Sequence, residues 1–422
     1  MSGTTSFFRN DTDTHIVKAE MKKKYILIVT ALCAMILAAG SCKQDNGQAK
    51  YIFLMIGDGM GETHVAAAES YLSYEKGRFG GEQLTFTQFP VLGSCTTYSA
   101  NSEVTCSSAS GTAIASGYKT NNDLIGLNPE GEPLKSIAYI LKEQGYKVGI
   151  MSSVPVNHAT PASFYAHNGN RNDYYNISME IPESGFDFFG GSGFIHYYGK
   201  KGEKDGIDRF LQDNGYTVCY GEREFEEKSD DCDKVIFIQN SGKGKEARLY
   251  NADGKKEDGD IDLGEMLDLA IDYLGDKQPF FIMCEGGEID WCAHENKTMP
   301  MIKAVMNFDD AVAEAYKFYL KHPDETLIVV TADHETGGIT LGGAQHVYKL
   351  TWEAIAEEWE NSGEANFLNS KDNEELNRKG NIGWTTHAHT GGPVPVYAIG
   401  KGAERFAGRI DNTDIIKKIV LK

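Results

Sequence analysis

Five short runs rich in apolar residues recur along the chain, each followed closely by glycine or polar residues. They cover 51–56, 147–151, 279–284, 326–331 and 394–399. A nearly continuous apolar run of this length, bounded by turn residues, predicts a strand buried on both faces. Apolar residues at helical spacing predict helices at 134–144, 263–274 and 301–320. Strands that alternate with helices indicate an α/β fold, a central and mostly parallel β-sheet flanked by helices on both faces.

Two segments interrupt this alternation. Residues 185–259 mix glycines, aromatics and charges, with a short strand expected at 235–238. Residues 341–383 are polar and partly helical around 352–359. We interpret both as peripheral insertions in a single domain, because neither carries its own alternation of strands and helices.

The N-terminal region has the layout of an export signal. Met21 and three lysines precede an apolar run at 26–39, which ends in small residues before Cys42. The run is shorter than the roughly 20 residues that a membrane-spanning helix needs. We therefore predict a signal peptide at 21–42, with Cys42 as a bacterial lipoprotein cysteine, and a single catalytic domain at 43–422. Residues 1–20 fit neither part, which suggests that translation begins at Met21.

Charge and cysteine content narrow the possible ligands. The chain has 422 residues and a formal net charge of −20, and an acidic surface repels nucleic acid and offers a polyanion no broad basic surface. An anionic substrate must therefore be held locally, by metal ions or a placed arginine. Six cysteines follow Cys42, none in a CxxC pair, which argues against a cysteine zinc site. Export permits disulfides, and Cys219 with Cys232 is the first pair that we expect.

Residues with the chemistry of metal ligands follow the predicted strands or precede the last one. They are Asp58, Glu285, Asp290, His294, Asp333, His334 and His389. Asp290 and His294 are four residues apart, which on a helix places both on one face. Asp333 and His334 are adjacent, so both point inward only from a loop. Carboxylate and imidazole together suit zinc, and ligand sites of parallel sheets lie at the carboxyl ends of the strands.

Ser107 is the candidate nucleophile, in the small-residue run 104–112 at the expected start of a helix. A serine hydroxyl becomes reactive through a neighbouring base, an altered pKa or a metal ion. The run lacks the G-x-S-x-G pattern of the hydrolase elbow, which leaves metal activation as the first hypothesis. The structural alternative is a small-residue helix that packs closely on the sheet.

Taken in order, these motifs resemble the alkaline phosphatase family along nearly the whole exported chain. Gly57–Gly61 resembles the family's opening metal motif, and 104–112 its nucleophile signature. The stretch from His158 through Thr160 to Arg171 is similar to the segment that supplies a third metal site and a phosphate-binding arginine. The three later clusters match its remaining ligand motifs. These clusters are Glu285 with Asp290 and His294, Asp333 with His334, and His389. The resemblance implies hydrolysis of phosphate monoesters through a phosphoserine intermediate on Ser107.

The resemblance also implies two zinc ions and a third ion, usually magnesium. The first zinc would be held by Asp290, His294 and His389. The second would be held by Asp58, Ser107, Asp333 and His334. The third site would use Asp58, Thr160 and Glu285, with His158 beside it, and Arg171 would bind phosphate oxygens. His387 matches no family ligand and is expected to be structural or to support a ligand.

Three positions depart from the family pattern. Cys106 stands where the family usually has an aspartate that orients the arginine, so we expect weaker retention of phosphate. His158 and Trp291 stand at positions that vary among members. His158 together with Trp291 puts the preference of the third site for magnesium in doubt, since the site loses an oxygen ligand and magnesium favours oxygen.

The sequence is also compatible with three other functions. Thr160 and Glu285 argue against a related phosphodiesterase, because a third metal site fills the space that a second ester group would need. A sulfatase would need a C/S-x-P-x-R context, which Cys106-Ser107 lacks. A non-catalytic exported protein that binds phosphate or zinc would keep the metals without turnover.

The resemblance and the N-terminal pattern together set expectations about partners and compartment. We expect small-molecule phosphate monoesters as substrates, no nucleic acid partner and a homodimer. The protein would be exported, either to the periplasm or to the outer membrane of a bacterium through a lipid on Cys42.

Overall fold

The structure, a computed structural model, describes residues 47–243, 258–344, 346–362 and 370–420. Those from Gln48 onward form one compact unit. The predicted start region, signal peptide and Cys42 lie outside the described residues, and the domain boundaries remain predictions. None of the described helices combines the length and the apolar character needed to cross a bilayer.

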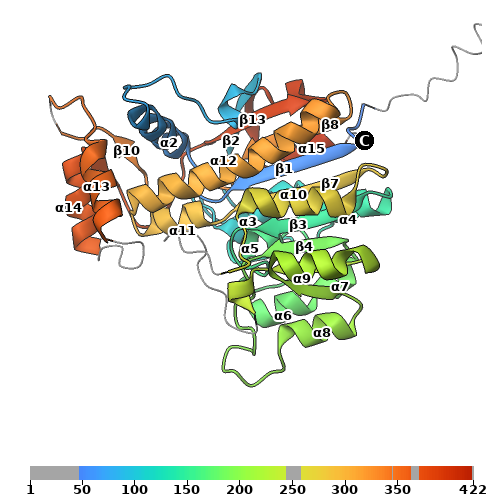
Figure 1. Cartoon of the computed structure of the whole chain (residues 1–422). Helices are drawn as coiled ribbons and strands as arrows, with labels where there is room; N and C mark the ends of the chain where they lie inside the picture. Colours follow the sequence, from blue (N-terminus) through green and yellow to red (C-terminus); the bar gives the residue numbers. More distant parts are fainter. Residues whose placement is uncertain (1–46, 244–257, 345, 363–369, 421–422) are drawn as a thin grey trace, which may run out of the picture. The chain divides into compact units, whose positions relative to one another are not determined.

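A ten-stranded sheet forms the centre of this unit (Figure 1). Its order is β14-β2-β13-β8-β1-β7-β3-β4-β6-β5. The central strands are β1 (Tyr51–Gly57), β7 (Phe280–Gly286), β3 (Lys147–Ser152) and β8 (Thr326–Thr331). They pair in parallel, and every residue of β1, β7 and β8 is buried. The continuous apolar runs therefore mark the strands that helices cover on both faces, as predicted.

One side of the sheet departs from parallel pairing. The last predicted strand, β13 (Val394–Gly400), runs antiparallel to β8 and to β2 (Val91–Thr96). Beyond it, β14 (Gly408–Asp411) pairs in parallel with β2. The sheet is thus mostly parallel, which confirms the expected fold class.

Helices cover both faces of the sheet (Figure 1). The long helix α12 (Thr298–Lys321) contacts β1, β7 and β8, and packs between α2 (Glu62–Glu75) and α10 (Leu263–Leu274). A second group includes α3 (Ser107–Ser116), α4 (Ile137–Glu143) and α5 (Ala159–Ala162). In α10, Asp262 accepts a hydrogen bond from the amide of Glu265, a capping box that fixes the first turn.

The two interrupting segments have defined places in the fold. Within 185–259, the strands β4 (Phe188–Gly191), β6 (Val235–Ile238) and β5 (Thr217–Tyr220) continue the central sheet at its edge. This segment is therefore more regular than its mixed composition suggests. Within 341–383, the helices α13 (Trp352–Ser362) and α14 (Ser370–Gly380) lie between two short strands. These strands, β10 (Thr340–Leu341) and β11 (Ile382–Gly383), pair with each other.

The expected disulfide is absent from the described residues. All six described cysteines are free thiols. Cys219 is buried in β5, and the thiol of Cys232 donates to the carbonyl of Ser229 at 3.4 Å. The prediction of a Cys219–Cys232 disulfide is therefore wrong for this structure, in which both residues are free thiols.

Candidate active site and metal centre

The predicted site residues meet at the carboxyl ends of four adjacent strands, β8, β1, β7 and β3. Asp58 follows β1, Asp333 and His334 follow β8, and Glu285 lies near the end of β7. The others come from connecting segments: Asp290 and His294 on α11 (Glu288–His294), His158 and Thr160 at the start of α5, and His389 on β12 (His389–Thr390). Parallel strands bring these ends to one edge of the sheet.

The first group consists of Asp290, His294 and His389, as predicted for one metal ion. Asp290 Oδ1 lies 3.3 Å from His294 Nε2 and 3.6 Å from His389 Nε2, and the two Nε2 atoms are 3.1 Å apart. The helical turn of α11 places Asp290 and His294 on one face, as their spacing predicts. One carboxylate oxygen and two imidazole nitrogens thus converge on one point, with His294 partly exposed to solvent.

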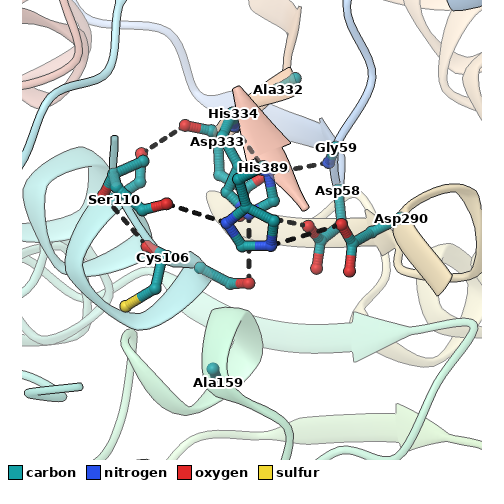
Figure 2. Close-up of polar contacts among 12 residues, drawn as sticks. Asp58, Gly59, Cys106, Ser110, Ala159, Asp290, Ala332, Asp333, His334 and His389 are labelled. Carbon is teal, nitrogen blue, oxygen red and sulfur yellow. Dashed lines mark hydrogen bonds and ion pairs between the residues drawn. The ribbon is translucent and has the colours of Figure 1, made fainter. Parts of the chain in front are cut away.

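The second group surrounds His334 and is fully buried (Figure 2). His334 Nε2 lies 3.4 Å from Asp58 Oδ1, 3.2 Å from Asp333 Oδ2 and 3.2 Å from Ser107 Oγ. Asp333 Oδ1 is engaged by the backbone amides of Gly59 and His334. Asp290 also lies within reach of Asp58 and His334, so this one carboxylate borders both groups.

The third group lies on the other side of Asp58. It contains Asp58, Glu285 and His158, with donor atoms close enough to share one ion. Thr160 follows His158 by two residues, and its buried hydroxyl has no hydrogen-bond partner among the described residues. Ser152 donates a short hydrogen bond to Glu285 Oε2, which leaves Oε1 without a partner. His158 thus lies with the oxygen donors of the third site, beside which the sequence analysis placed it.

Unpartnered buried atoms show that these residues fit metal ions. Both carboxylate oxygens of Asp58, Asp333 Oδ2, Glu285 Oε1 and His158 Nδ1 are buried without a hydrogen-bond partner among the described residues. A buried, unpaired carboxylate is costly, and a bound cation removes that cost. Mixed carboxylate and imidazole donors, in groups of three or four, are a typical zinc ligand set.

The electrostatics of the protein without ions agree with this interpretation. Burial and the neighbouring carboxylates raise the pKa of Asp58 well above its ordinary value. Burial also raises the pKa of Glu285 and of Asp333 to about 7. The pKa of Asp290 is lowered, because its hydrogen bond with His294 and the nearby imidazoles outweigh its burial. Crowded carboxylates hold protons unless cations replace them.

The two imidazoles of the first group are oriented by hydrogen bonds that their Nδ1 atoms make. His294 Nδ1 donates to the carbonyl of His387 at 2.7 Å, and His389 Nδ1 donates to the carbonyl of Thr105 at 2.8 Å. Each contact leaves Nε2 directed into the cluster, the arrangement seen for metal-ligating histidines. His387 in turn donates through Nδ1 to the carbonyl of His294 at 2.8 Å. It therefore supports a ligand without joining the cluster.

Ser107 is the first residue of α3 and is buried at the edge of the second group. The same helix also holds the loop that carries Asp333: Ser110 donates to the carbonyl of Asp333 at 2.6 Å (Figure 2). Asn412 donates to Ser110 Oγ at 2.9 Å. The sequence analysis identified neither Ser110 nor Asn412, because no local motif marks a hydrogen bond between segments this far apart along the chain.

Arg171 also reaches the site. Its Nη2 atom lies 3.4 Å from His158 Nε2, and its backbone amide donates to Asp123. The thiol of Cys106 accepts a hydrogen bond from the amide of Asp123 at 3.2 Å and lies near the guanidinium. All the predicted site residues are therefore brought together around one edge of the sheet.

Comparison with known proteins identifies the family. The family model described as alkaline phosphatase matches residues 49–197 and 199–421. The chain belongs to the alkaline phosphatase family. Alkaline phosphatase 4 of Bacillus subtilis is 31% identical to it, over 90% of this chain and 91% of that protein.

Solved alkaline phosphatases share the fold. The enzyme from the Antarctic bacterium TAB5 has a TM-score of 0.70 and 31% identity, over 88% of this chain and 97% of its own. The cold-active alkaline phosphatase of Shewanella sp. has a TM-score of 0.74 and 27% identity, over 87% and 98% of the two chains. A TAB5 variant with aspartate in place of a histidine has magnesium in its M3 site. This chain is accordingly a metal-binding hydrolase of phosphate monoesters.

Proposed function

We propose that this alkaline phosphatase hydrolyses its substrates through a phosphoserine formed on Ser107. The contact between Ser107 Oγ and His334 Nε2, at 3.2 Å, carries this proposal, because it directs the hydroxyl into the buried ligand cluster. Ser107 also begins a ten-residue helix, so the first backbone amides of α3 face an approaching anion. The hydroxyl, the cluster and the helix end converge where a phosphoryl group would react.

We propose two zinc sites and a third site of undecided metal. Asp290, His294 and His389 would hold one zinc, and the second group with Ser107 would hold the other. Zinc ions in these places would lower the pKa of the serine hydroxyl and neutralise charge on the attacking and leaving oxygens. Asp58, Thr160, Glu285 and His158 would hold the third ion, and the magnesium-bearing TAB5 variant supports magnesium there when oxygen donors predominate.

The remaining steps use groups of the chain itself. The guanidinium of Arg171 would bind two phosphate oxygens in a planar fork and orient phosphorus toward Ser107 Oγ. Attack by Ser107 breaks the bond between phosphorus and the ester oxygen, and the alcohol leaves. Water then attacks the phosphoserine, which releases inorganic phosphate and restores the serine hydroxyl.

A chelator-sensitive assay tests this function against its alternatives. A chromogenic phosphate monoester and a matching diester are supplied at alkaline pH, with and without a chelator. We expect monoester hydrolysis that the chelator abolishes and added zinc restores, with little diester hydrolysis. Preferred diester hydrolysis would favour a related phosphodiesterase, and metal or phosphate binding without turnover would favour a binding protein.

We further propose export, with lipid attachment at Cys42, and a homodimer. The sequence of residues 21–42 supports export, and the family resemblance supports the dimer. Mass spectrometry of the mature N-terminus tests the first, and light scattering of the purified enzyme tests the second. An unmodified chain that retains residues before Cys42 would refute lipidation, and a monomer at assay concentrations would refute the dimer.

A further inference from the structure

Thr336 contacts one ligand from each of the first two groups. Its side chain is fully buried on the short strand β9 (Glu335–Thr336). The hydroxyl oxygen lies 2.5 Å from Asp290 Oδ1 and 3.2 Å from His334 Nδ1. One hydroxyl group therefore bridges a carboxylate of the first group and an imidazole of the second.

The direction of the two hydrogen bonds follows from the proton inventory. A hydroxyl donates one proton, and an ionised carboxylate only accepts. The contact at 2.5 Å uses that proton, with the Thr336 hydroxyl as the donor and Asp290 Oδ1 as the acceptor. Thr336 therefore donates to Asp290 and accepts from His334 Nδ1–H. This arrangement places the imidazole proton on Nδ1 and leaves the lone pair of Nε2 directed at the second group.

Among the described residues, His334 is the histidine of the first two groups whose Nδ1 contacts a side chain rather than a backbone carbonyl. His294 and His389 donate through Nδ1 to backbone carbonyls, which a substitution at the acceptor residue does not remove. His334 donates to a side-chain hydroxyl. A single substitution at Thr336 therefore removes the tautomer control of His334 and, at the same time, a hydrogen bond to Asp290.

The surrounding backbone holds the Thr336 hydroxyl in place. Thr336 pairs with His389 across the two-stranded ladder of β9 and β12, and its amide donates to the carbonyl of Gly59 at 3.0 Å. Gly59 has a φ of +71°, and a Cβ atom there would lie 2.8 Å from Thr336 Oγ1. The neighbouring Glu335 accepts a short hydrogen bond from Thr390. The strand that carries Thr336 is thus held by β12 on one side and by the turn at Gly59.

We propose that Thr336 is a positioning residue that couples the two zinc sites, orienting Asp290 for one and His334 for the other. The proposal rests on the proposed function, because it assigns those residues as ligands. Removing the hydroxyl would release both ligands at once. Loss of hydrogen-bonding partners of ligands typically costs about 10- to 100-fold in metal affinity.

Zinc affinity measured by competition with a chromophoric chelator tests the proposal. Thr336→Val keeps the shape and removes the hydroxyl, whereas Thr336→Ser keeps the hydroxyl. Thr331→Val is the matched control, because Thr331 is equally buried but its hydroxyl donates to the carbonyl of Pro395 at 3.0 Å. We expect both zinc dissociation constants to rise about 10- to 100-fold in Thr336→Val. Thr336→Ser and Thr331→Val should keep the affinity of the parent.

The possible outcomes distinguish failure of the proposed coupling by Thr336 from failure of the proposed two-zinc function. Parent-like affinity in Thr336→Val, or weakening at one site alone, would overturn the coupling. Failure of the unmodified protein to bind two zinc ions would instead overturn the proposed function. If Thr336→Val does not fold, nitrogen-15 NMR of the unmodified, metal-free protein decides. A proton on His334 Nδ1 supports the proposal, and a proton on Nε2 contradicts it.

Discussion

The guanidinium of Arg171 lies beside an imidazole, with Nη2 3.4 Å from His158 Nε2. Burial and the charge of Arg171 lower the pKa of His158 to about 3, so this imidazole is neutral at neutral and alkaline pH. A neutral acceptor holds a guanidinium less firmly than a carboxylate does. In the proposed mechanism, phosphate would therefore be bound by an arginine that has no carboxylate at position 106 to anchor it.

Cys106→Asp tests this view of the arginine. A carboxylate beside the guanidinium would fix Arg171 and tighten competitive inhibition by inorganic phosphate by about tenfold, the effect of roughly 1.4 kcal/mol. Cys106 is the N-cap of α3, so aspartate would also stabilise the helix. Cys106→Asn is the matched control, since it caps the helix without charge. An inhibition constant that is equal in the two variants would show that charge at this position does not act on Arg171.

His158→Asp tests the metal of the third site. The change replaces a nitrogen donor with oxygen beside Asp58, Glu285 and Thr160, so magnesium affinity should rise. We expect magnesium bound per chain, after dialysis against a fixed magnesium concentration, to increase relative to the unmodified protein. His158→Asn, a neutral oxygen donor, should give a smaller increase. Unchanged magnesium content in both variants would exclude His158 from that site.

Without metal ions, the protein should become more stable as the solution becomes less alkaline. Burial raises the pKa of Glu285 and Asp333 to about 7, and the hydrogen bond with Asp290 raises that of His294 to about 8. At these three groups the folded, metal-free protein binds protons that the unfolded chain does not. Burial lowers the pKa of His64, His158, His334 and His389, and these groups act in the opposite sense as the pH approaches 6.5, so the stability should rise as the pH falls from about 8.5 to 7.5. Asp290 stays ionised across this window and contributes nothing to the slope.

Thermal unfolding of the chelated protein measures this dependence. The melting temperature should be higher at about pH 7.5 than at about pH 8.5, and zinc-loaded protein should show a weaker or opposite trend. A melting temperature of the chelated protein that falls on this acidification would contradict the assignment of these groups to a charge-crowded, metal-dependent cluster.

The central sheet is largely predictable because its strands are buried on both faces. The run at 326–331 coincides with β8, and the helical spacing at 263–274 coincides with α10. The edges were harder to predict. β2 alternates buried and partly exposed residues, and β5 and β4 have only four residues each, so neither gives a continuous apolar run. Pairing with the rest of the sheet, rather than local pattern, stabilises them.

The candidate ligands are predictable because aspartate and histidine next to strand ends have few structural uses. Hydroxyl groups carry no such signal. Ser152, Ser110 and Thr336 are ordinary residues of strands and helices in sequence, and their partners lie 133, 223 and 46 residues away along the chain. The local sequence around Thr336 offers one indication, which is that Thr336 follows the candidate ligand His334 by two residues.

Trapping of the phosphorylated enzyme tests the central claim most directly. The enzyme is mixed with a phosphate monoester, quenched in acid, digested and analysed by mass spectrometry, with Ser107→Ala in parallel as the matched control. We expect phosphate on Ser107 of the unmodified enzyme, and Ser107→Ala should lose most turnover while it still binds zinc. Full turnover in Ser107→Ala, or phosphate trapped on another residue, would contradict the account.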